Sequence, residues 1–321
     1  MIATFDGFDN RPSVTTAWYA VATASVATAA CANVMPSGMG SAFHSLSNTY
    51  SAKPPSRLGT KSTFPLLYIN HLRGSMDAID PLLMNSIAQN REAIVYDSFG
   101  IGHSEGTVPP SAETVASIAA KLLSALGVSK ADVIGLSMGG GVAQILAWDH
   151  PQLVNKLVLA GTQPGVGEGV VLPPREVLES AGAINDEPPT REEMFHLFFF
   201  YPSESPLALG DDWWKRIHER KVEGEERRGY LVGAGAQAQL NAIFSFTVDT
   251  NNFERLKDIK APTLVTNGHA DIMSPTSNSF ALQQNLRDAQ LIIYPDAGHG
   301  HLFQVPELYA EHLELFLSDT R

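Results

Sequence analysis

The sequence predicts a doubly wound, mostly parallel α/β sheet with an inserted helical cap. Two observations carry this prediction. From residue 64 onward, short apolar runs typical of buried strands alternate with segments of helical periodicity. The alternation stops over residues 162–252, which contain only helical segments and loops rich in Pro and Gly. Strands that are apolar along their whole length and separated by helices are typical of a parallel sheet covered on both faces.

Six short apolar runs are the expected strands of this sheet. They cover residues 66–69, 93–96, 131–136, 157–160, 263–266 and 291–294. Helical spacing follows the first two strands over residues 81–89 and 111–126, and a Gly-rich helix over 140–148 follows the third. In such a sheet ligands bind beyond the carboxyl ends of the strands, so side chains located there are the first candidates for a site.

The pattern divides the chain into an extension, a core and a cap. Residues 64–161 and 253–321 form the expected core, and residues 162–252 form the expected helical cap, with helices over 191–201, 210–221 and 225–244. Aromatic side chains gather in the cap, and those that face inward would line an apolar pocket. They are Phe195, Phe198, Phe199, Phe200, Tyr201, Trp213 and Trp214.

Residues 1–63 form an N-terminal extension that is uncharged over residues 17–35. A secretory signal would need a basic start, but Asp6 and Asp9 stand there beside Arg11. A membrane span would need about 20 strongly apolar residues, and repeated Thr and Ser make this run too polar. We therefore expect a poorly structured extension, or a weak helix on the domain, in a cytoplasmic protein. Organelle targeting or secretion, and a membrane span, are the alternatives.

Charge and cysteine content exclude several classes of function. The chain has 321 residues, and 22 Lys and Arg against 34 Asp and Glu give a net charge of −12. An acidic chain without basic clusters is a poor partner for nucleic acid or for an anionic membrane. The single cysteine, Cys31, cannot form an intrachain disulfide or a thiolate metal cage. The ten histidines show no metal-ligand spacing, so we expect no metal and no cofactor.

The segment Gly135-Leu136-Ser137-Met138-Gly139 matches the pattern G-x-S-x-G and lies between the third strand and its helix. This strand–turn–helix setting is the one that a nucleophile elbow requires. A Cβ two residues before or after the serine would clash in the strained turn, which explains the glycines. The hydroxyl of Ser137 is then expected above the sheet, beside the N–H groups at the start of the helix. The alternative is a glycine-rich helix start with a capping serine.

A serine hydroxyl is a weak nucleophile at neutral pH and needs a base, which in turn needs an orienting carboxylate. Asp271 follows the fifth expected strand and His299 follows the sixth, so both are expected at the same edge of the sheet as Ser137. Asp296 is a weaker candidate for the acid because it is too close in sequence to His299. We expect His301 to support the site or to lie on the surface.

These motifs make residues 64–318 resemble the α/β-hydrolase superfamily, in its cap-bearing serine esterase and haloperoxidase-like branch. The turn over residues 97–106 is also similar to that family's D-x-x-G-x-G-x-S segment. Carried over by motif, the resemblance implies that Ser137 is the nucleophile, His299 the base and Asp271 the acid.

The resemblance also implies an oxyanion hole made of two backbone N–H groups. Family members carry His-Gly-x after the strand that corresponds to residues 66–69. Aligning Asn70 with the family histidine puts the N–H of Leu72 at one donor position, and the N–H of Met138 supplies the other. The glycine that the family carries beside the first donor is missing here.

We therefore expect a serine hydrolase that cleaves a carboxylic ester, thioester or lactone of a hydrophobic small molecule through an acyl-enzyme. The serine at position 137 excludes epoxide hydrolase and dehalogenase chemistry, for which this family uses an aspartate. Acyl transfer, C–C bond hydrolysis and perhydrolase chemistry use the same triad and stay open. A non-catalytic ligand-binding protein and a structural interaction protein are the alternatives from other classes. The sequence leaves the oligomeric state open.

Overall fold

The computed structural model describes residues 56–182, 187–190, 199–201, 203–219 and 226–320. At its centre lies a seven-stranded sheet in the order β1-β3-β2-β4-β5-β6-β7. The strands are β1 (Ser56–Leu58), β2 (Leu66–Ile69), β3 (Ala93–Val95), β4 (Ala131–Leu136), β5 (Val154–Ala160), β6 (Thr263–Gly268) and β7 (Ala289–Tyr294). β1 runs antiparallel to β3, and the other neighbouring pairs are parallel. The sheet is therefore mostly parallel, as the uninterrupted apolar strands predict.

The beginning of the sheet differs from the sequence prediction. A stretch rich in Pro and Gly predicts a loop before residue 64, but β1 pairs with β3 and extends the sheet back to Ser56. β1 is a half-buried edge strand without an apolar run, so periodicity gives no signal for it. β5 also begins earlier than predicted, at Val154, because Val154 pairs with Ala131 of β4. The polar Asn155 and Lys156 interrupt the apolar run there, and the buried Lys156 ammonium donates to the carbonyl oxygen of Phe316.

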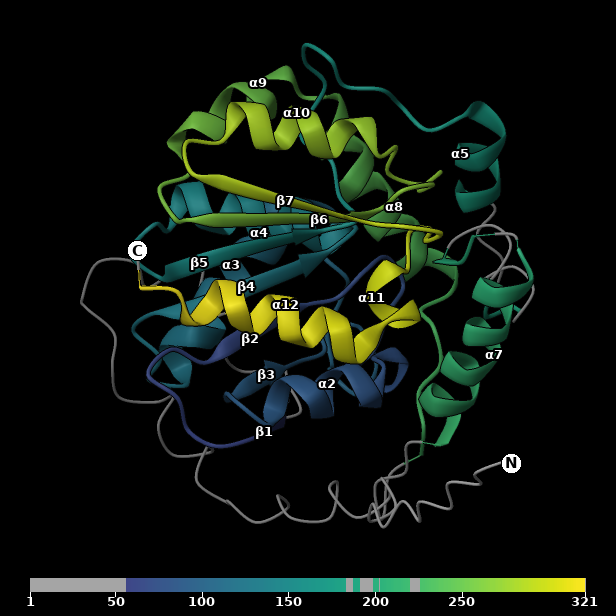
Figure 1. Cartoon of the computed structure of the whole chain (residues 1–321), viewed down its shortest axis with the longest axis horizontal. Helices are drawn as coiled ribbons and strands as arrows, with labels where there is room; N and C mark the ends of the chain where they lie inside the picture. The colour runs from purple at the N-terminus through teal and green to yellow at the C-terminus, as the bar shows by residue number, and fades with distance from the viewer. Residues whose placement is uncertain (1–55, 183–186, 191–198, 202, 220–225, 321) are drawn as a thin grey trace, which may run out of the picture.

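Helices cover both faces of the sheet (Figure 1). α2 (Pro81–Ala88) and α12 (Pro306–Ser318) pack on one face, in a buried cluster that includes Leu66 and Tyr68 of β2. α3 (Ala112–Ala125), α4 (Met138–Asp149) and α10 (Ser277–Asn285) pack on the other face, in a cluster that includes Leu67 and Ile69. Alternate residues of one strand serve the two clusters because successive side chains point to opposite sides of a sheet.

Short-range signals set the ends of two core helices. The side chain of Asp80 accepts a hydrogen bond from the N–H of Leu82 at the start of α2, where Pro81 occupies the first turn. The Ser111 hydroxyl caps α3 by accepting from the N–H of Thr114, at 3.2 Å. Gly127 follows α3 with a φ of 68°, which is the left-handed stop that its sequence position predicts.

The chain between β5 and β6 carries the inserted helical cap. It contains α5 (Arg175–Gly182), α7 (Glu204–Glu219) and α8 (Gly233–Val248), followed by α9 (Thr250–Glu254) and a 3-10 turn, Arg255–Asp258. α5 is a helix that the Pro- and Gly-rich pattern does not predict. α7 begins and α8 ends outside the predicted ranges, and residues 191–198 of the predicted helix over 191–201 lie outside the described part of the chain.

A buried ion pair ties the cap to the core. Arg216 of α7 donates from Nε and Nη2 to the two carboxylate oxygens of Asp80, at 3.0 and 2.7 Å. The Asp80 side chain is fully buried, whereas that of Arg216 is 22% exposed. Figure 1 shows α5 and α7 on the side of the molecule opposite the C-terminus, beyond one end of the sheet. No helix in the described ranges is long and apolar enough to cross a bilayer, and the extension over residues 1–55 lies outside them.

Strand order places the segments that follow the strands. β2 lies between β3 and β4, so the chain reverses its direction of winding at the β2–β4 pair, where open α/β sheets bind ligands. Ile69 at the end of β2 is paired with Gly135 near the end of β4. The segments that begin at Asn70 and at Ser137 therefore leave the sheet side by side.

Candidate active site

Ser137 occupies a strained turn between β4 and α4. Its backbone angles are φ 56° and ψ −119°, and its side chain does not cap the helix. A non-glycine residue in this region costs about 1–3 kcal/mol, which the surrounding structure must offset. A Cβ at Gly135 would lie 2.2 Å from the carbonyl oxygen of Gly139, and one at Gly139 would lie 2.2 Å from that of Ile69. Both glycines are therefore required by close backbone approach, as the motif predicts.

The backbone of Ser137 is fixed by the neighbouring strand. Its N–H donates to the carbonyl oxygen of Ala160, at 2.9 Å, and its carbonyl accepts from the Thr162 hydroxyl, at 2.8 Å. Met138 opens α4, so its N–H has no partner within the helix and points from the positive end of the helix dipole. This is the position at which the sequence predicts one oxyanion donor.

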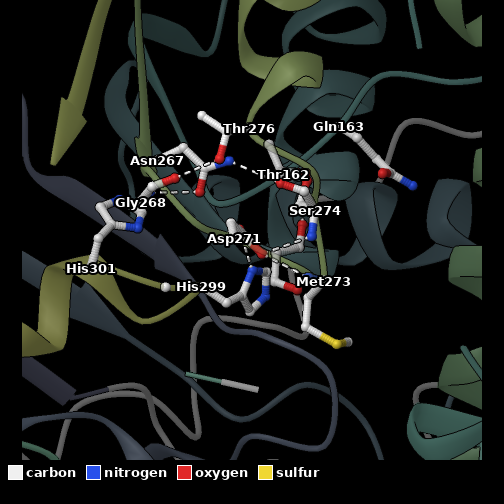
Figure 2. Close-up of polar contacts among 12 residues, drawn as sticks. Thr162, Gln163, Asn267, Gly268, Asp271, Met273, Ser274, Thr276, His299 and His301 are labelled. Carbon is white, nitrogen blue, oxygen red and sulfur yellow. Dashed lines mark hydrogen bonds and ion pairs between the residues drawn. The ribbon is translucent and has the colours of Figure 1, made fainter. Parts of the chain in front are cut away.

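Asp271 and His299 meet beyond the ends of β6 and β7 (Figure 2). The distance between His299 Nδ1 and Asp271 Oδ2 is 2.7 Å, and both side chains are buried, at 4% and 0% exposure. The other carboxylate oxygen, Oδ1, accepts from the backbone N–H groups of Met273 and Ser274, each at 2.8 Å. Three donors thus hold the carboxylate in one orientation, in which Oδ2 faces the imidazole.

The imidazole of His299 lies against the segment that supports Ser137. A Cβ at Gly161, between Ala160 and Thr162, would lie 3.3 Å from His299 Nδ1. No hydrogen bond in the described part of the chain joins the Ser137 hydroxyl to this imidazole. Such contacts are often long in unliganded enzymes and shorten when substrate is bound.

The loop after β2 carries the second predicted oxyanion donor, Leu72. No hydrogen bond between described residues uses the N–H of Leu72. The next residue, Arg73, has a positive φ of 66°. Its N–H donates to Oε1 of the buried Gln239 in α8, at 2.7 Å, and its carbonyl accepts from the N–H of Leu231, at 2.8 Å. Two residues from the cap region therefore hold this loop in shape.

Phe199 connects the cap with the loop of His299. Its ring is stacked on the His299 imidazole, with centroids 6.0 Å apart and planes 7° apart, and it meets the ring of His71 edge-on at 5.1 Å. Its carbonyl accepts from the N–H of Gly300, at 2.7 Å. In the same loop, the side-chain oxygen of Gln304 accepts from the N–H of Gly298.

His301 is fully buried, so it does not lie on the surface. Its Nε2 lies 3.0 Å from the hydroxyl of Thr266. Burial lowers the pKa of His301 to about 3, so its ring is neutral at pH 7. Asp296, the weaker candidate for the acid, is exposed and has a φ of 48°. Among the described residues no group of three or more His, Cys, Asp or Glu side chains is placed to hold a metal ion, and Cys31 lies outside them.

Comparison with known proteins identifies the family. The sequence model described as the alpha/beta hydrolase fold matches residues 65–305, which is most of the chain. The chain belongs to the alpha/beta hydrolase fold family. This alpha/beta hydrolase is 32% identical to the alpha/beta hydrolase fold protein from Chitinophaga pinensis, whose structure it matches with a TM-score of 0.72 over 85% of this chain and 97% of that one.

Curated relatives of this alpha/beta hydrolase carry different names. It is 30% identical over 240 residues to the putative carbamate hydrolase RutD from Caulobacter vibrioides, which covers 73% of this chain and 83% of the relative. It is 28% identical over 264 residues to the 2-hydroxymuconate semialdehyde hydrolase from Pseudomonas putida, which covers 80% of this chain and 88% of the relative. The family is therefore shared, whereas the names do not agree on a substrate.

The sequence did not point to the residues that hold the site's loops. Gln239 and Phe199 accept hydrogen bonds from backbone that is distant from them in sequence, whereas Gln304 accepts from backbone nearby. No local motif indicates any of the three. In the sequence, Phe199 is one of several cap aromatics, and nothing singles it out. A glutamine amide can both donate to and accept from loop backbone, but nothing in the sequence indicates which glutamines are buried beside a loop.

Proposed function

We propose that this protein is a serine hydrolase that forms an acyl-enzyme. The observation that carries the proposal is the buried 2.7 Å contact between Asp271 and His299, at the same sheet edge as the strained turn of Ser137. The fold and the names of the relatives support hydrolysis in general terms. The assignment of Ser137, His299 and Asp271 as nucleophile, base and acid is our own.

In this proposal the Ser137 oxygen attacks the substrate carbonyl carbon, and Nε2 of His299 takes the hydroxyl proton. Asp271 fixes the tautomer, because its Oδ2 faces Nδ1 and requires a proton there. It also stabilises the imidazolium that forms. His299 then gives the proton to the leaving group, which departs as the tetrahedral intermediate collapses to the acyl-enzyme. A water molecule, deprotonated by His299, releases the acid and restores the serine.

The negative charge on the tetrahedral oxygen needs donors that are already in position. The N–H of Met138, at the start of α4, and the N–H of Leu72 are the proposed pair. Loss of one such donor typically costs about 10²–10³ in kcat. Gln239 and Leu231 support this role because they hold the backbone of Arg73, the residue after Leu72, from the cap side.

The proposed substrate is an ester, thioester or lactone of a hydrophobic small molecule. Phe199, Phe200 and Trp213 of the cap region are buried together with Phe303, and aromatic side chains of this kind line most small-molecule sites. One relative is named for a carbamate and another for a semialdehyde. Carbamate cleavage and C–C bond hydrolysis are therefore the alternative reactions of the same three residues.

The test combines a covalent label with a substrate panel. A fluorophosphonate probe should label the wild type at Ser137, as located by peptide mass spectrometry, and should not label Ser137→Ala. The panel contains 4-nitrophenyl acyl esters, a thioester, a lactone, a carbamate and a vinylogous 1,5-diketone for C–C cleavage. Labelling without turnover of any of these would leave only a ligand-binding or acyl-transfer role. A wild type that is neither labelled nor active would contradict the proposal.

A further inference from the structure

His71 is buried beside the proposed oxyanion donor, and one of its ring nitrogens is unpartnered. Its Nδ1 lies 2.8 Å from the carbonyl oxygen of Leu72, and because a carbonyl only accepts, Nδ1 carries a proton. Burial lowers the pKa of His71 to about 4, so the ring is neutral at pH 7. Nε2 therefore presents a lone pair, and it has no hydrogen-bond partner among the described residues.

Aromatic side chains surround this nitrogen-bearing ring. Phe199 and Phe303 meet it edge-on, at centroid distances of 5.1 and 6.5 Å, and Tyr230 lies 6.0 Å away. The buried hydroxyl of Tyr230 also has no hydrogen-bond partner among the described residues. Burial raises the pKa of Tyr230 above its usual value, so its hydroxyl stays neutral. An acceptor and a hydroxyl, both uncharged, thus stand within an otherwise apolar cluster.

The position of His71 connects this cluster with the proposed reaction. His71 immediately precedes Leu72, whose N–H is proposed to bind the substrate carbonyl oxygen. The ring of Phe199 contacts the rings of both His71 and His299. Arg227 and Arg73 lie close enough to Tyr230 to lower its pKa, and both guanidinium groups donate to backbone carbonyl oxygens, of Asp77 and Leu231 respectively. An acyl chain that extends from the carbonyl toward the cap would therefore meet an uncharged acceptor.

We propose that Nε2 of His71 accepts a hydrogen bond from a hydroxyl or N–H group on the acyl part of the substrate. This inference rests on the proposed function and narrows its substrate class to uncharged acyl compounds that carry such a donor near the scissile carbonyl. A carboxylate at this place would set its oxygen lone pairs against that of Nε2. A plain alkyl chain would leave Nε2 without water and without a hydrogen-bond partner. Sites built to hydrogen-bond a substrate group strongly reject analogues that lack this group.

The experiment compares matched 4-nitrophenyl esters that differ in one group. The set contains the butanoate, the 2-hydroxy- and 3-hydroxybutanoates, and the hemisuccinate, which carries a carboxylate. The quantity measured is the ratio of kcat/KM for each ester to that for the butanoate, after correction for spontaneous hydrolysis. The ratios are measured for the wild type, His71→Phe and His71→Gln. His218→Phe is the matched control, because His218 also meets a carbonyl through Nδ1 but is exposed on α7.

In the wild type, one hydroxy ester should be preferred over the butanoate by at least about tenfold, which is one hydrogen bond of about 1.4 kcal/mol, and the hemisuccinate should be disfavoured. His71→Phe should bring the hydroxy ratio to about one, His71→Gln should recover part of it through its amide oxygen, and His218→Phe should keep it.

Two results would overturn the inference. One is a wild type that turns over the hydroxy esters and the butanoate equally, and the other is a preference that survives in His71→Phe. Either would assign Nε2 to a buried water. The ratio of kcat/KM between hydroxy ester and butanoate is measured on the wild type alone, so the inference can be refuted even if His71→Phe misfolds. Fluorophosphonate labelling of Ser137 separates this failure from failure of the proposed function, because an unlabelled wild type contradicts both.

Discussion

The substitution Asp271→Asn tests the proposed role of the acid, because the structure fixes how the new amide must lie. Oδ1 of Asp271 accepts from the N–H groups of Met273 and Ser274, at 2.8 Å each. The asparagine must keep its oxygen there, since the reverse orientation would turn its NH₂ group toward two donors. Two hydrogen bonds at about 1 kcal/mol each make about 2 kcal/mol, which is a preference of about 30-fold.

With its oxygen held at that position, the amide directs its NH₂ group at Nδ1 of His299. Nδ1 must then accept, so the imidazole proton moves to Nε2, which faces away from Asp271. An imidazole that carries its proton on Nε2 cannot take another from Ser137. The same change of tautomer in a Ser-His-Asp enzyme lowers kcat by about 10⁴, which is about 5.4 kcal/mol at 1.36 kcal/mol for each tenfold change.

The assay is kcat at pH 7 with the best ester of the panel, together with the rate of fluorophosphonate labelling. Both rates should fall by about 10³–10⁴ in Asp271→Asn, because both depend on the same base. The free energy of unfolding should change little, because both backbone contacts are kept. Asp296→Asn is the control, since it makes the same substitution on an exposed residue three positions before His299. A loss of less than tenfold in Asp271→Asn, or an equal loss in the control, would refute the reasoning.

Three further predictions concern stability. Gly139→Ala should lower the free energy of unfolding, measured by urea titration, by about 3 kcal/mol, because the new Cβ would lie 2.2 Å from a backbone oxygen. The control Gly229→Ala, whose Cβ would have nothing within 4 Å, should change it by less than about 0.5 kcal/mol. Equal losses in the two variants would contradict the clash at Gly139. Arg216→Met should cost about 3–5 kcal/mol because it leaves the carboxylate of Asp80 buried without its cation, and adding Asp80→Asn should restore part of the loss; a loss below about 1 kcal/mol would show that water reaches Asp80. The pKa of His301 falls from 6.5 to about 3 on folding, so the stability that its neutral ring contributes is complete above pH 6.5 and is lost as the pH falls toward 3. The difference in unfolding free energy between wild type and His301→Gln should therefore shrink by about 1.4 kcal/mol per pH unit below 6.5, and a difference that stays constant down to pH 4 would show that the ring is not buried in its neutral form.

The parts of the fold that the sequence predicts are those whose cause is local. β2 and β4 have the predicted bounds, because both strands are buried along their whole length and contain almost no polar residue. The elbow at Ser137 follows from two glycines whose absent Cβ atoms leave room for neighbouring backbone. β1 could not be predicted, because Ser56–Leu58 is a strand only through its pairing with β3. α5 starts directly after two prolines, which predict a loop equally well as the first turn of a helix.

The candidate site likewise has features that the sequence predicts and features that depend on contacts distant in sequence. The order of Ser137, Asp271 and His299 along the strands predicts that they approach one sheet edge, and the 2.7 Å contact between the last two is a consequence of neighbouring strands. The direction of each side chain is set by contacts that the sequence does not contain. Asp271 is oriented by its own loop, whereas the loop of His299 is held by Gln304 and by the carbonyl of Phe199.

The proposed oxyanion loop at Leu72 shows how the cap also shapes the core. The glycine that this family carries beside the first proposed donor is missing at position 71, and Arg73, on the other side of Leu72, adopts a positive φ, which is costly for a residue with a side chain. What offsets this cost is the cap: Gln239 accepts from the N–H of Arg73, and Leu231 donates to its carbonyl, across more than 150 positions of sequence. The shape of the loop at Leu72 therefore depends on the docking of α8. We therefore expect a substitution in the cap to be able to change kcat without touching the substrate, so the cap and the proposed oxyanion loop should be altered together when the specificity of this protein is redesigned.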